Sequence, residues 1–309
     1  MKTAIVGYTG FVGSNICATT KFDAYYNSKN IEKAYGTCPD LLVYSGVPSE
    51  MYLANKFPDK DLAVIENAIN NLKKINPKRL VLISSIAVYN QTFDVDEDTV
   101  IDKFKSTAYG RNRRILEEWV EQNITDALIV RLPGIYGINL KKNFLYDMIH
   151  VIPAMLTVSK YQELASVSSI IKANYNILDN GFAKCMATEK DIRKLLKAEF
   201  QKLDFTALNF TDSRGVFQYF HLNNLWDLVE KALDTKIRLL NIAVEPVSIG
   251  EIYSFVNNGE TFDNKLNKPI PHFDFKTIHA EIFGGQNGYI LDKVCCLKQI
   301  KDFVIKESL

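Results

Sequence analysis

Three glycines, Gly7, Gly10 and Gly13, lie between a short apolar run and a segment with helical character. Glycine permits a sharp turn and lets the backbone approach a pyrophosphate, while the helix start adds unpaired N–H donors and the positive end of its dipole. The order of strand, G-x-x-G-x-x-G and helix is typical of a dinucleotide-binding turn. The residues predicted to bind the phosphates are Gly7, Thr9, Gly10, Phe11, Val12 and Gly13.

The end of the second expected strand indicates which dinucleotide would bind. In a protein that binds NAD, an Asp or Glu about 20 residues after the turn would hydrogen-bond the ribose 2′-hydroxyl. Here the chain has Asn27, Ser28 and Lys29 instead. Because this strand end lacks a carboxylate, nothing there would repel a 2′-phosphate. Ser28 and Lys29 are suited to bind such a phosphate. The pattern favours NADP over NAD as the cofactor. The alternative is that Lys29 is a solvated surface charge that contacts no cofactor.

A second group of residues is suited to proton transfer. Ser84 and Ser85 follow the fourth expected strand, at the edge where open α/β sheets bind ligands. Tyr109 and Arg113 are four residues apart on one face of the next helix. A fixed cation favours the phenolate form of a tyrosine, which makes Tyr109 a candidate general acid and base. A nearby serine hydroxyl would polarise the same substrate oxygen.

The elements that position these residues alternate regularly. Apolar runs predict strands, and apolar residues at helical spacing predict helices between them. This alternation predicts an α/β fold: a doubly wound parallel sheet with helices on both faces. The expected strands are 3–6, 23–27, 40–44, 79–83 and 127–131, and the expected helices are 11–19, 59–75 and 107–122.

The pattern changes after residue 138. Residues 141–215 are expected to be helical and rich in loops, with a solvent-facing amphipathic helix at 188–200. We therefore predict a dinucleotide-binding domain at 1–138 and a smaller, mostly helical substrate or lid domain at 139–309. Strands are expected at 218–222 and 239–243, and the second of them is predicted to return to the main sheet.

Composition excludes several other classes of function. The net charge of +1 gives no reason to expect nucleic-acid or anionic-membrane binding, and no apolar run is long enough to span a bilayer. Five scattered cysteines and four ungrouped histidines predict neither a disulfide framework nor a metal site. With no signal-peptide pattern at the N-terminus, we expect a cytoplasmic protein.

Four motifs in order make the chain resemble the extended short-chain dehydrogenase/reductase superfamily, the NAD-dependent epimerase/dehydratase family. They are residues 7–13 (GYTGFVG), 84–89 (SSIAVY), 109–113 (YGRNR) and 130–137 (VRLPGIYG). The resemblance is continuous to about residue 138 and patchy afterwards. It implies a Rossmann domain, a nicotinamide cofactor and a nucleotide-linked small-molecule substrate. It also implies a homodimer built through the helices at 59–75 and 107–122.

The resemblance also implies roles for individual residues. Ser85, four places before Tyr89, would be the hydroxyl that polarises the substrate, and Tyr109 would be the catalytic acid and base. The residues expected to lie along the cofactor are Ser45, Gly46, Ser84, Pro133 and Ile135, with the last two bordering the nicotinamide.

The chain departs from the family pattern in two ways. The family has Y-x-x-x-K, whereas this chain has Arg113, which keeps the charge but differs in length and shape. Either Arg113 substitutes for the lysine that holds the nicotinamide ribose, or the chain binds cofactor and catalyses poorly. Ile86 and Ala87 replace the acidic pair of the dehydratases, which argues against dehydration.

Three functions remain open at this point. The first is an NAD(P)-dependent reductase or epimerase acting on a nucleotide-linked sugar or related carbonyl. The second is a dinucleotide-binding regulatory or scaffold protein that has lost catalysis. The third is an NADP-dependent reductase of small aldehydes or phenolic precursors.

Overall fold

The computed structural model describes residues 1–179 and 181–308, and the chain divides into two compact units. The first contains Met1–Asn139, Val216–Val247 and Pro271–Gln299. The second contains Leu140–Gly215, Ser248–Ile270 and Ile300–Leu309. The first segment of the first unit ends at Asn139, and the two later segments add strands and helices to that unit. The division into a dinucleotide-binding domain at 1–138 and a substrate domain at 139–309 stays a prediction.

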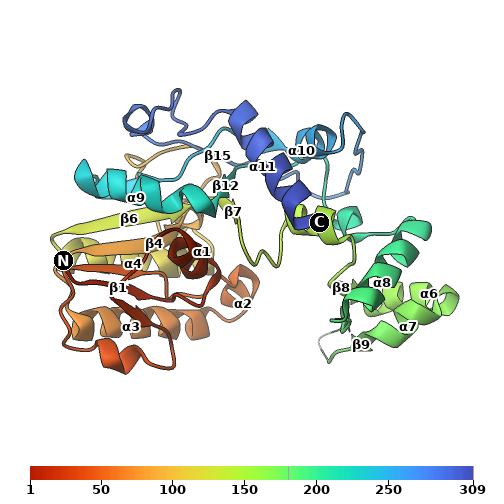
Figure 1. Cartoon of the computed structure of the whole chain (residues 1–309), viewed down its shortest axis with the longest axis horizontal. Coiled ribbons are helices and arrows are strands. Elements are labelled where there is room, and N and C mark those ends of the chain that lie inside the picture. The colour runs from red at the N-terminus through yellow and green to blue at the C-terminus, as the bar shows by residue number, and fades with distance from the viewer. Residues whose placement is uncertain (180, 309) are drawn as a thin grey trace. The chain divides into compact units, whose positions relative to one another are not determined.

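A six-stranded parallel sheet forms the centre of the first unit, which confirms the predicted fold class (Figure 1). Its spatial order is β13-β6-β4-β3-β1-β2. The strands are β1 (Thr3–Val6), β2 (Ala24–Tyr26), β3 (Leu41–Tyr44), β4 (Leu80–Ser85), β6 (Ala127–Leu132) and β13 (Leu239–Asn241). Because β13 pairs in parallel with β6, the strand expected near 239–243 does return to the main sheet.

The order of the strands places a topological switch point between β1 and β3. From β1 the chain first adds β2 on one side and then β3 on the other side. In open parallel sheets the crevice at such a reversal, outside the carboxyl ends of the strands, is where ligands bind. The glycine turn at 7–13 follows β1 at this point, and residues 45–46 follow β3.

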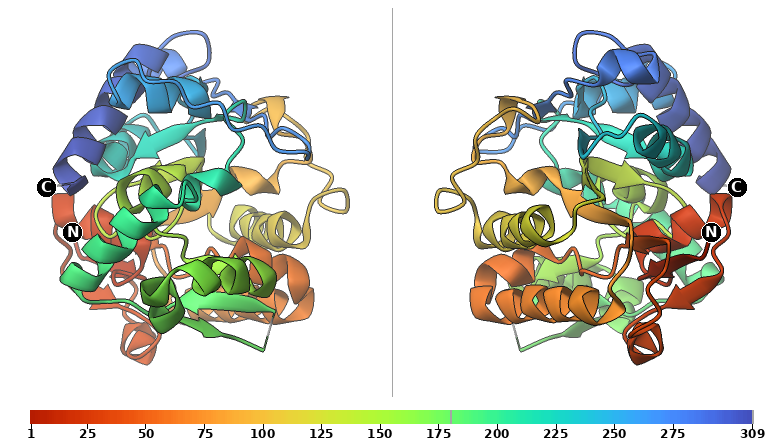
Figure 2. Two further views of the ribbon diagram at one scale, coloured as in Figure 1. Left: turned by 90° about the vertical axis from the view of Figure 1, so that its right-hand side faces the viewer. Right: turned by 90° about the vertical axis from the view of Figure 1, so that its left-hand side faces the viewer.

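Helices cover both faces of this sheet. On one face α3 (Pro58–Ile75) lies beside α4 (Ala108–Asn123), seen in orange and olive in Figure 2. Their apolar stripes, such as Ile65 and Leu116, pack on alternate strand residues including Leu42. On the other face α1 (Phe11–Thr19) contacts α9 (Leu225–Asp234). Since both faces are covered, the strands are almost fully apolar, as expected for a parallel sheet.

Shorter elements complete the chain. The paired strands are β5 (Phe93–Val95) with β15 (Asp274–Phe275) and β7 (Gly134–Tyr136) with β12 (Tyr219–His221). Other α-helices and strands of the first and second units are α2 (Met51–Lys56), α5 (Phe144–His150), α10 (Ile249–Val256), α11 (Lys293–Ser308), β11 (Val216–Phe217) and β14 (Val247–Ser248).

The second unit contains a small α+β core that the sequence did not reveal. The strands β8 (Met155–Thr157), β9 (Tyr175–Ile177) and β10 (Phe182–Cys185) form an antiparallel sheet in the order β8-β10-β9. The helices α6 (Val158–Val167), α7 (Ser169–Asn174) and α8 (Lys190–Lys202) accompany it. The helix expected at 188–200 is present as α8, but Leu196 and Phe200 are fully buried, so one face of it is core.

Candidate cofactor and active site

The glycine turn is packed so closely that two of its positions exclude a side chain. Gly7 has φ of +90°, and a Cβ there would lie 2.5 Å from the Ser45 carbonyl oxygen. A Cβ on Gly13 would lie 2.2 Å from the Gly7 carbonyl oxygen. The Gly10 N–H donates to that same oxygen at 2.9 Å, which closes the turn. Gly7 and Gly13 are therefore required by the course of the backbone itself.

The start of α1 is open to an anion. Gly10 is its N-cap residue and provides no side-chain hydrogen bond to the first turn, and Thr9 and Gly10 are exposed. The first N–H groups of a helix have no partner within the helix. Among the described residues no side chain caps these donors, so the backbone fits the diphosphate of a dinucleotide.

At the end of β2, Asn27 shapes the turn with its side chain. Its Oδ1 accepts the Lys29 N–H at 2.9 Å, and its own N–H donates to Asn30 Oδ1 at 2.7 Å. Ser28 and Lys29 are exposed. Asn27 therefore holds the backbone, while Ser28 and Lys29 are the residues of this turn that are accessible to a ligand.

Ser45 and Gly46 join the ends of β1 and β3. The Ser45 hydroxyl donates to the Val6 carbonyl at 3.0 Å, and its N–H donates to the same oxygen at 2.9 Å. A Cβ on Gly46 would lie 2.9 Å from a Val6 methyl carbon. In this position Ser45 supports the glycine turn from below, since it also packs against Gly7 and Gly13.

The two serines after β4 have different partners. The Ser84 hydroxyl donates to Glu117 Oε1 at 2.5 Å. Ser85 Oγ accepts the Ala87 N–H at 3.2 Å, as the cap of the short helix η2 (Ile86–Val88). Within residues 1–179 and 181–308, the Ser85 hydroxyl has no acceptor for its hydrogen, so Ser85 is the serine that remains able to donate.

Ser84 belongs to a buried polar network that the sequence analysis missed. Glu117 is completely buried and forms two hydrogen bonds to the Arg131 guanidinium, at 3.0 and 2.6 Å. Arg131 Nη1 also donates to the Tyr89 hydroxyl at 2.8 Å, and Tyr89 contacts Asn241 of β13. Burial raises the pKa of Tyr89 to about 12, although the charge of Arg131 acts in the opposite direction. The network joins three strands behind the sheet edge.

Tyr109 lies in the first turn of α4. Its backbone N–H, which has no partner within the helix, donates to Asn55 Oδ1 at 2.9 Å. The next residue, Gly110, is so close to η2 that a Cβ would lie 1.9 Å from the Ala87 carbonyl oxygen. The segment that carries Ser85 and the start of the helix that carries Tyr109 are therefore in direct contact. In the part of the chain that the structure describes, the Tyr109 hydroxyl makes no hydrogen bond.

Arg113 stacks on this tyrosine, with its guanidinium carbon 4.2 Å from the centre of the Tyr109 ring. Its terminal nitrogens bind both oxygens of Asp61 at 2.9–3.1 Å, and Nη2 donates to the Pro48 carbonyl at 2.6 Å. The side chains of Arg113 and Asp61 are only 5% and 11% exposed. Tyr109 and Arg113 do share a face as predicted, but the charge of Arg113 is directed at Asp61.

Pro133 and Ile135 are half-buried and flank Gly134, at the point where β6 passes into β7. A Cβ on Gly134 would lie 2.7 Å from the Gln218 carbonyl oxygen, because β7 runs directly beside β12. Since the main sheet is parallel, the residues after β1, β2, β3, β4 and β6 all lie along one edge of it. The predicted site residues therefore share this edge, and Tyr109 joins them through η2.

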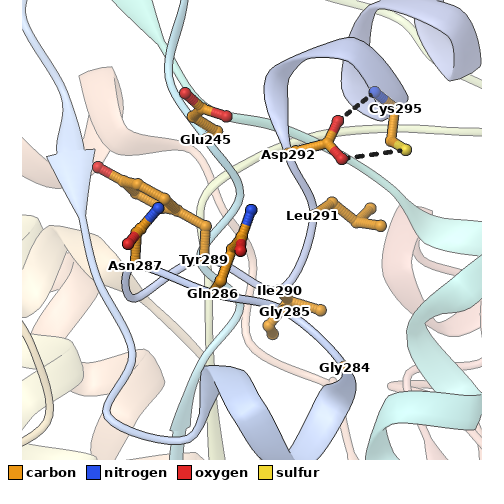
Figure 3. Close-up of a pocket in the computed structure, with 10 residues that line it drawn as sticks. All are labelled: Glu245, Gly284, Gly285, Gln286, Asn287, Tyr289, Ile290, Leu291, Asp292 and Cys295. Atoms are coloured by element: carbon orange, nitrogen blue, oxygen red, sulfur yellow. Dashed lines mark hydrogen bonds between the residues drawn. The ribbon is translucent and has the colours of Figure 1, made fainter.

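A separate pocket in the first unit is lined by none of the predicted site residues. Its lining comes from residues 284–287 and 289–292, Glu245 and Cys295 (Figure 3). Asp292 Oδ1 accepts the Cys295 N–H at 2.7 Å, and Glu245 Oε2 accepts the Lys293 N–H at 2.7 Å. These carboxylates hold the start of α11, so we assign the pocket no ligand.

The described residues offer neither a metal site nor a membrane span. Residues 1–179 and 181–308 contain no group of three or more His, Cys, Asp or Glu side chains placed to bind a metal ion. In the same residues no helix is both long enough and apolar enough to cross a bilayer.

Comparison with known proteins gives a family match and a set of similar folds. Residues 26–171 match the sequence model of the NAD dependent epimerase/dehydratase family. A search of curated proteins found no significant match. Among solved structures, the chain is similar to dTDP-4-dehydrorhamnose reductase from Bacillus anthracis in complex with NADP. The identity is 13%, the TM-score is 0.63, and 99% of each chain is covered.

Two further structures extend the similarity to other members of the fold. The Bordetella bronchiseptica enzyme WbmG, in complex with NAD and UDP, is 13% identical with a TM-score of 0.62, covering 100% of this chain and 95% of that chain. UDP-glucose 4-epimerase from Thermotoga maritima, with UDP-glucose, is 10% identical with a TM-score of 0.60, covering 99% of both chains. Residues 26–171 are therefore similar to the NAD dependent epimerase/dehydratase family, and the full-length similarity to these structures shows that the chain shares their fold.

Proposed function

We propose that the chain is an NAD(P)-dependent reductase or epimerase that acts on a nucleotide-linked sugar or a related carbonyl compound. The observation that supports this proposal most strongly is the position of Tyr109. It lies at the same sheet edge as the open glycine turn, and its hydroxyl has no hydrogen-bond partner among the described residues. The similar folds support it, because their structures contain NADP, NAD with UDP, or UDP-glucose.

The cofactor would lie along the edge formed by the predicted binding residues. The amides of α1 and the glycine turn would bind its diphosphate, and the residues after β6 would border the nicotinamide. The exposed Ser28 and Lys29, with no carboxylate at the end of β2, favour NADP. The bound nicotinamide supplies the hydride or accepts it.

In this proposal the protein's own residues move the proton and orient the substrate. The Tyr109 hydroxyl would exchange a proton with the substrate oxygen, and the Ser85 hydroxyl would donate a hydrogen bond to the same oxygen. Epimerisation would use this exchange in both directions on opposite substrate faces, whereas reduction would use it once. Ile86 and Ala87 form the η2 turn and cannot transfer protons, so dehydration through these positions is not part of the proposal.

One observation favours a second candidate, a dinucleotide-binding protein with impaired catalysis. Both terminal nitrogens of Arg113 are occupied by Asp61 and Pro48, so they are not available to a ribose. We therefore assign Arg113 the role of holding the Tyr109 ring. The resemblance implies that the residue at position 113 holds the nicotinamide ribose. If this contact is essential and no other residue supplies it, turnover is lost while cofactor binding remains.

The remaining parts of the proposal concern the setting of the enzyme. The second unit is proposed to recognise the substrate, because the dinucleotide-binding residues all lie in the first. A homodimer through α3 and α4 and a cytoplasmic location are also proposals, the first from the resemblance and the second from the composition.

Tyr109→Phe tests the proposal directly. The variant removes one hydroxyl and keeps the ring that stacks on Arg113, so NADPH or NADH should bind with unchanged affinity by calorimetry. Turnover on a panel of nucleotide-linked ketosugars and hexoses should fall below detection. A Phe variant with wild-type turnover would contradict the mechanism. A wild-type protein that binds cofactor and turns over no panel member would support the second candidate.

A further inference from the structure

A completely buried asparagine links two parts of the proposed cofactor site that lie far apart in the sequence. Asn15, in the second turn of α1, is 0% exposed. Its Nδ2 donates to the Ile138 carbonyl at 2.9 Å, and its Oδ1 accepts the Ile138 N–H at 2.9 Å. The second hydrogen of Nδ2 is donated to the Phe11 carbonyl at 2.8 Å. Both donors of the amide are therefore used, and Ile138 is held by its N–H and its carbonyl together.

The residue before Ile138 shows how closely this contact is fitted. A Cβ on Gly137 would lie 2.4 Å from Asn15 Oδ1 and 3.3 Å from the Leu222 side chain. Only a glycine allows the backbone at 137 to pass between α1 and the start of η4 (Leu222–Asn224). The contact is built into the backbone on both sides, so it has one geometry and little room to adjust.

The two ends of this contact belong to different walls of the proposed site. Phe11 is the first residue of α1, where the phosphates are proposed to bind, and its carbonyl accepts the hydrogen bond from Asn15 Nδ2. Ile138 follows β7 closely, and β7 begins directly after Pro133 at the proposed nicotinamide border. One side chain therefore sets the spacing between the phosphate turn and the residues on the opposite side of the cofactor.

We propose that Asn15 is a positioning residue for the dinucleotide, which fixes the phosphate turn relative to residues 133–138 so that both halves of the cofactor bind at once. This inference rests on the proposed function, because it requires that a dinucleotide occupies this edge. A ligand that contacts only the phosphate turn does not need this spacing, whereas a whole dinucleotide does. The difference between the two ligands therefore distinguishes a residue that positions the cofactor from a residue that only stabilises the fold.

The test compares a whole cofactor with its adenosine half. Isothermal titration measures NADPH and 2′-phospho-ADP-ribose, with NADH and ADP-ribose in parallel, on wild type, Asn15→Ala and Asn15→Asp. Asn15→Ala loses three directed hydrogen bonds, and Asn15→Asp loses the two that Nδ2 donates. Either change should weaken whole-cofactor binding by about tenfold or more, while binding of the fragment changes by less than about threefold. Ser14→Ala is the matched control: it removes a hydrogen bond to the same Phe11 carbonyl but none to Ile138, and should leave both affinities unchanged.

Each outcome decides the question. Equal weakening of cofactor and fragment, or no weakening of either, would overturn the positioning role. If the Asn15 variants do not fold, amide exchange on the wild type gives the answer, because the Ile138 N–H should gain protection with NADPH or NADH and not with the fragments. Unchanged protection at Ile138 with the bound whole cofactor would also overturn it. If the wild type binds neither whole cofactor, the proposed function fails first and this inference fails with it.

Discussion

The ion pair between Arg113 and Asp61 makes a quantitative prediction about how the tyrosine is held. Both side chains are nearly buried, and they join the start of α4 to the start of α3. We consider three variants: Arg113→Met, Asp61→Leu and the double variant. The single variants each leave a buried charge without its partner, whereas the double variant removes both charges together.

The structure sets the expected magnitudes. Breaking a buried pair by removing one partner costs about 3–5 kcal/mol. Arg113→Met belongs near the lower end, because Asn112 still donates to Asp61 at 2.9 Å. The double variant leaves the Pro48 carbonyl without the Arg113 donor and removes one of the two acceptors of Asn112, which still donates to the Pro58 carbonyl; these two lost hydrogen bonds cost about 1 kcal/mol each. With about 3 kcal/mol for each single change and about 2 for both, the coupling energy is about 4 kcal/mol.

Urea unfolding followed by tryptophan fluorescence is the appropriate assay. Both tryptophans, Trp119 and Trp226, belong to the first unit, so the signal reports on the unit that contains the ion pair. NADPH or NADH affinity is measured on the same samples. The terminal nitrogens of Arg113 are already hydrogen-bonded to Asp61 and Pro48. The folded double variant should therefore bind the cofactor with a Kd within about threefold of the wild-type value. A coupling energy below about 1 kcal/mol would refute the buried pair. Loss of cofactor binding in a folded double variant would show that Arg113 contacts the cofactor directly.

Two further predictions concern the carboxylates of Glu117, which is buried, and Asp147, which is half-buried. Glu117→Gln removes the charge that balances Arg131 and should destabilise the first unit by about 3 kcal/mol in the same urea assay; a change below about 1 kcal/mol would contradict the network. Burial raises the pKa of Asp147 to about 7, so this group's contribution to stability is full below about pH 4 and is lost as the pH rises to about 7. Asp147→Asn should therefore have a higher free energy of unfolding than wild type at about pH 8, by up to roughly 4 kcal/mol, and the difference should shrink towards about pH 4. Urea unfolding followed by circular dichroism measures it, and a pH-independent difference would contradict the shift.

The parts of the fold that the sequence predicted are those governed by local pattern. The apolar run before Gly7 and the segment from Phe11 predict β1 and α1 with the bounds that the structure has. The turn between them is recognisable because its close packing leaves no room for a side chain at Gly7 or Gly13. Most strands of the main sheet are buried on both faces and are recognisable apolar runs, whereas β2 lies at the edge of the sheet with Tyr25 exposed. Strands β8 and β9 have only three residues each, which is too short for an alternating pattern to be detected in 141–215.

The contacts of the candidate site were less predictable because their partners are distant in sequence. Arg113 on its own indicates a cation beside a tyrosine, and nothing near it identifies Asp61, which lies on another helix. The same holds for Asn55 and Tyr109. Glu117 had a detectable signal, since it lies eight residues after Tyr109 on the same helical face, but its partner Arg131 comes from a strand read as apolar core.

These contacts change how the replacement of the family lysine by Arg113 is to be understood. Tyr109, Arg113 and Glu117 form one buried stripe along α4, and each is held by a polar group from a different element. A lysine at 113 would have one nitrogen where the arginine uses two, so it could not bind both Asp61 oxygens and the Pro48 carbonyl with the same geometry. Arg113→Lys would thus fail to restore the family's arrangement, because Asp61 would compete with any ribose for the single ammonium group. The arginine and the aspartate form one unit, and the function of either depends on the other.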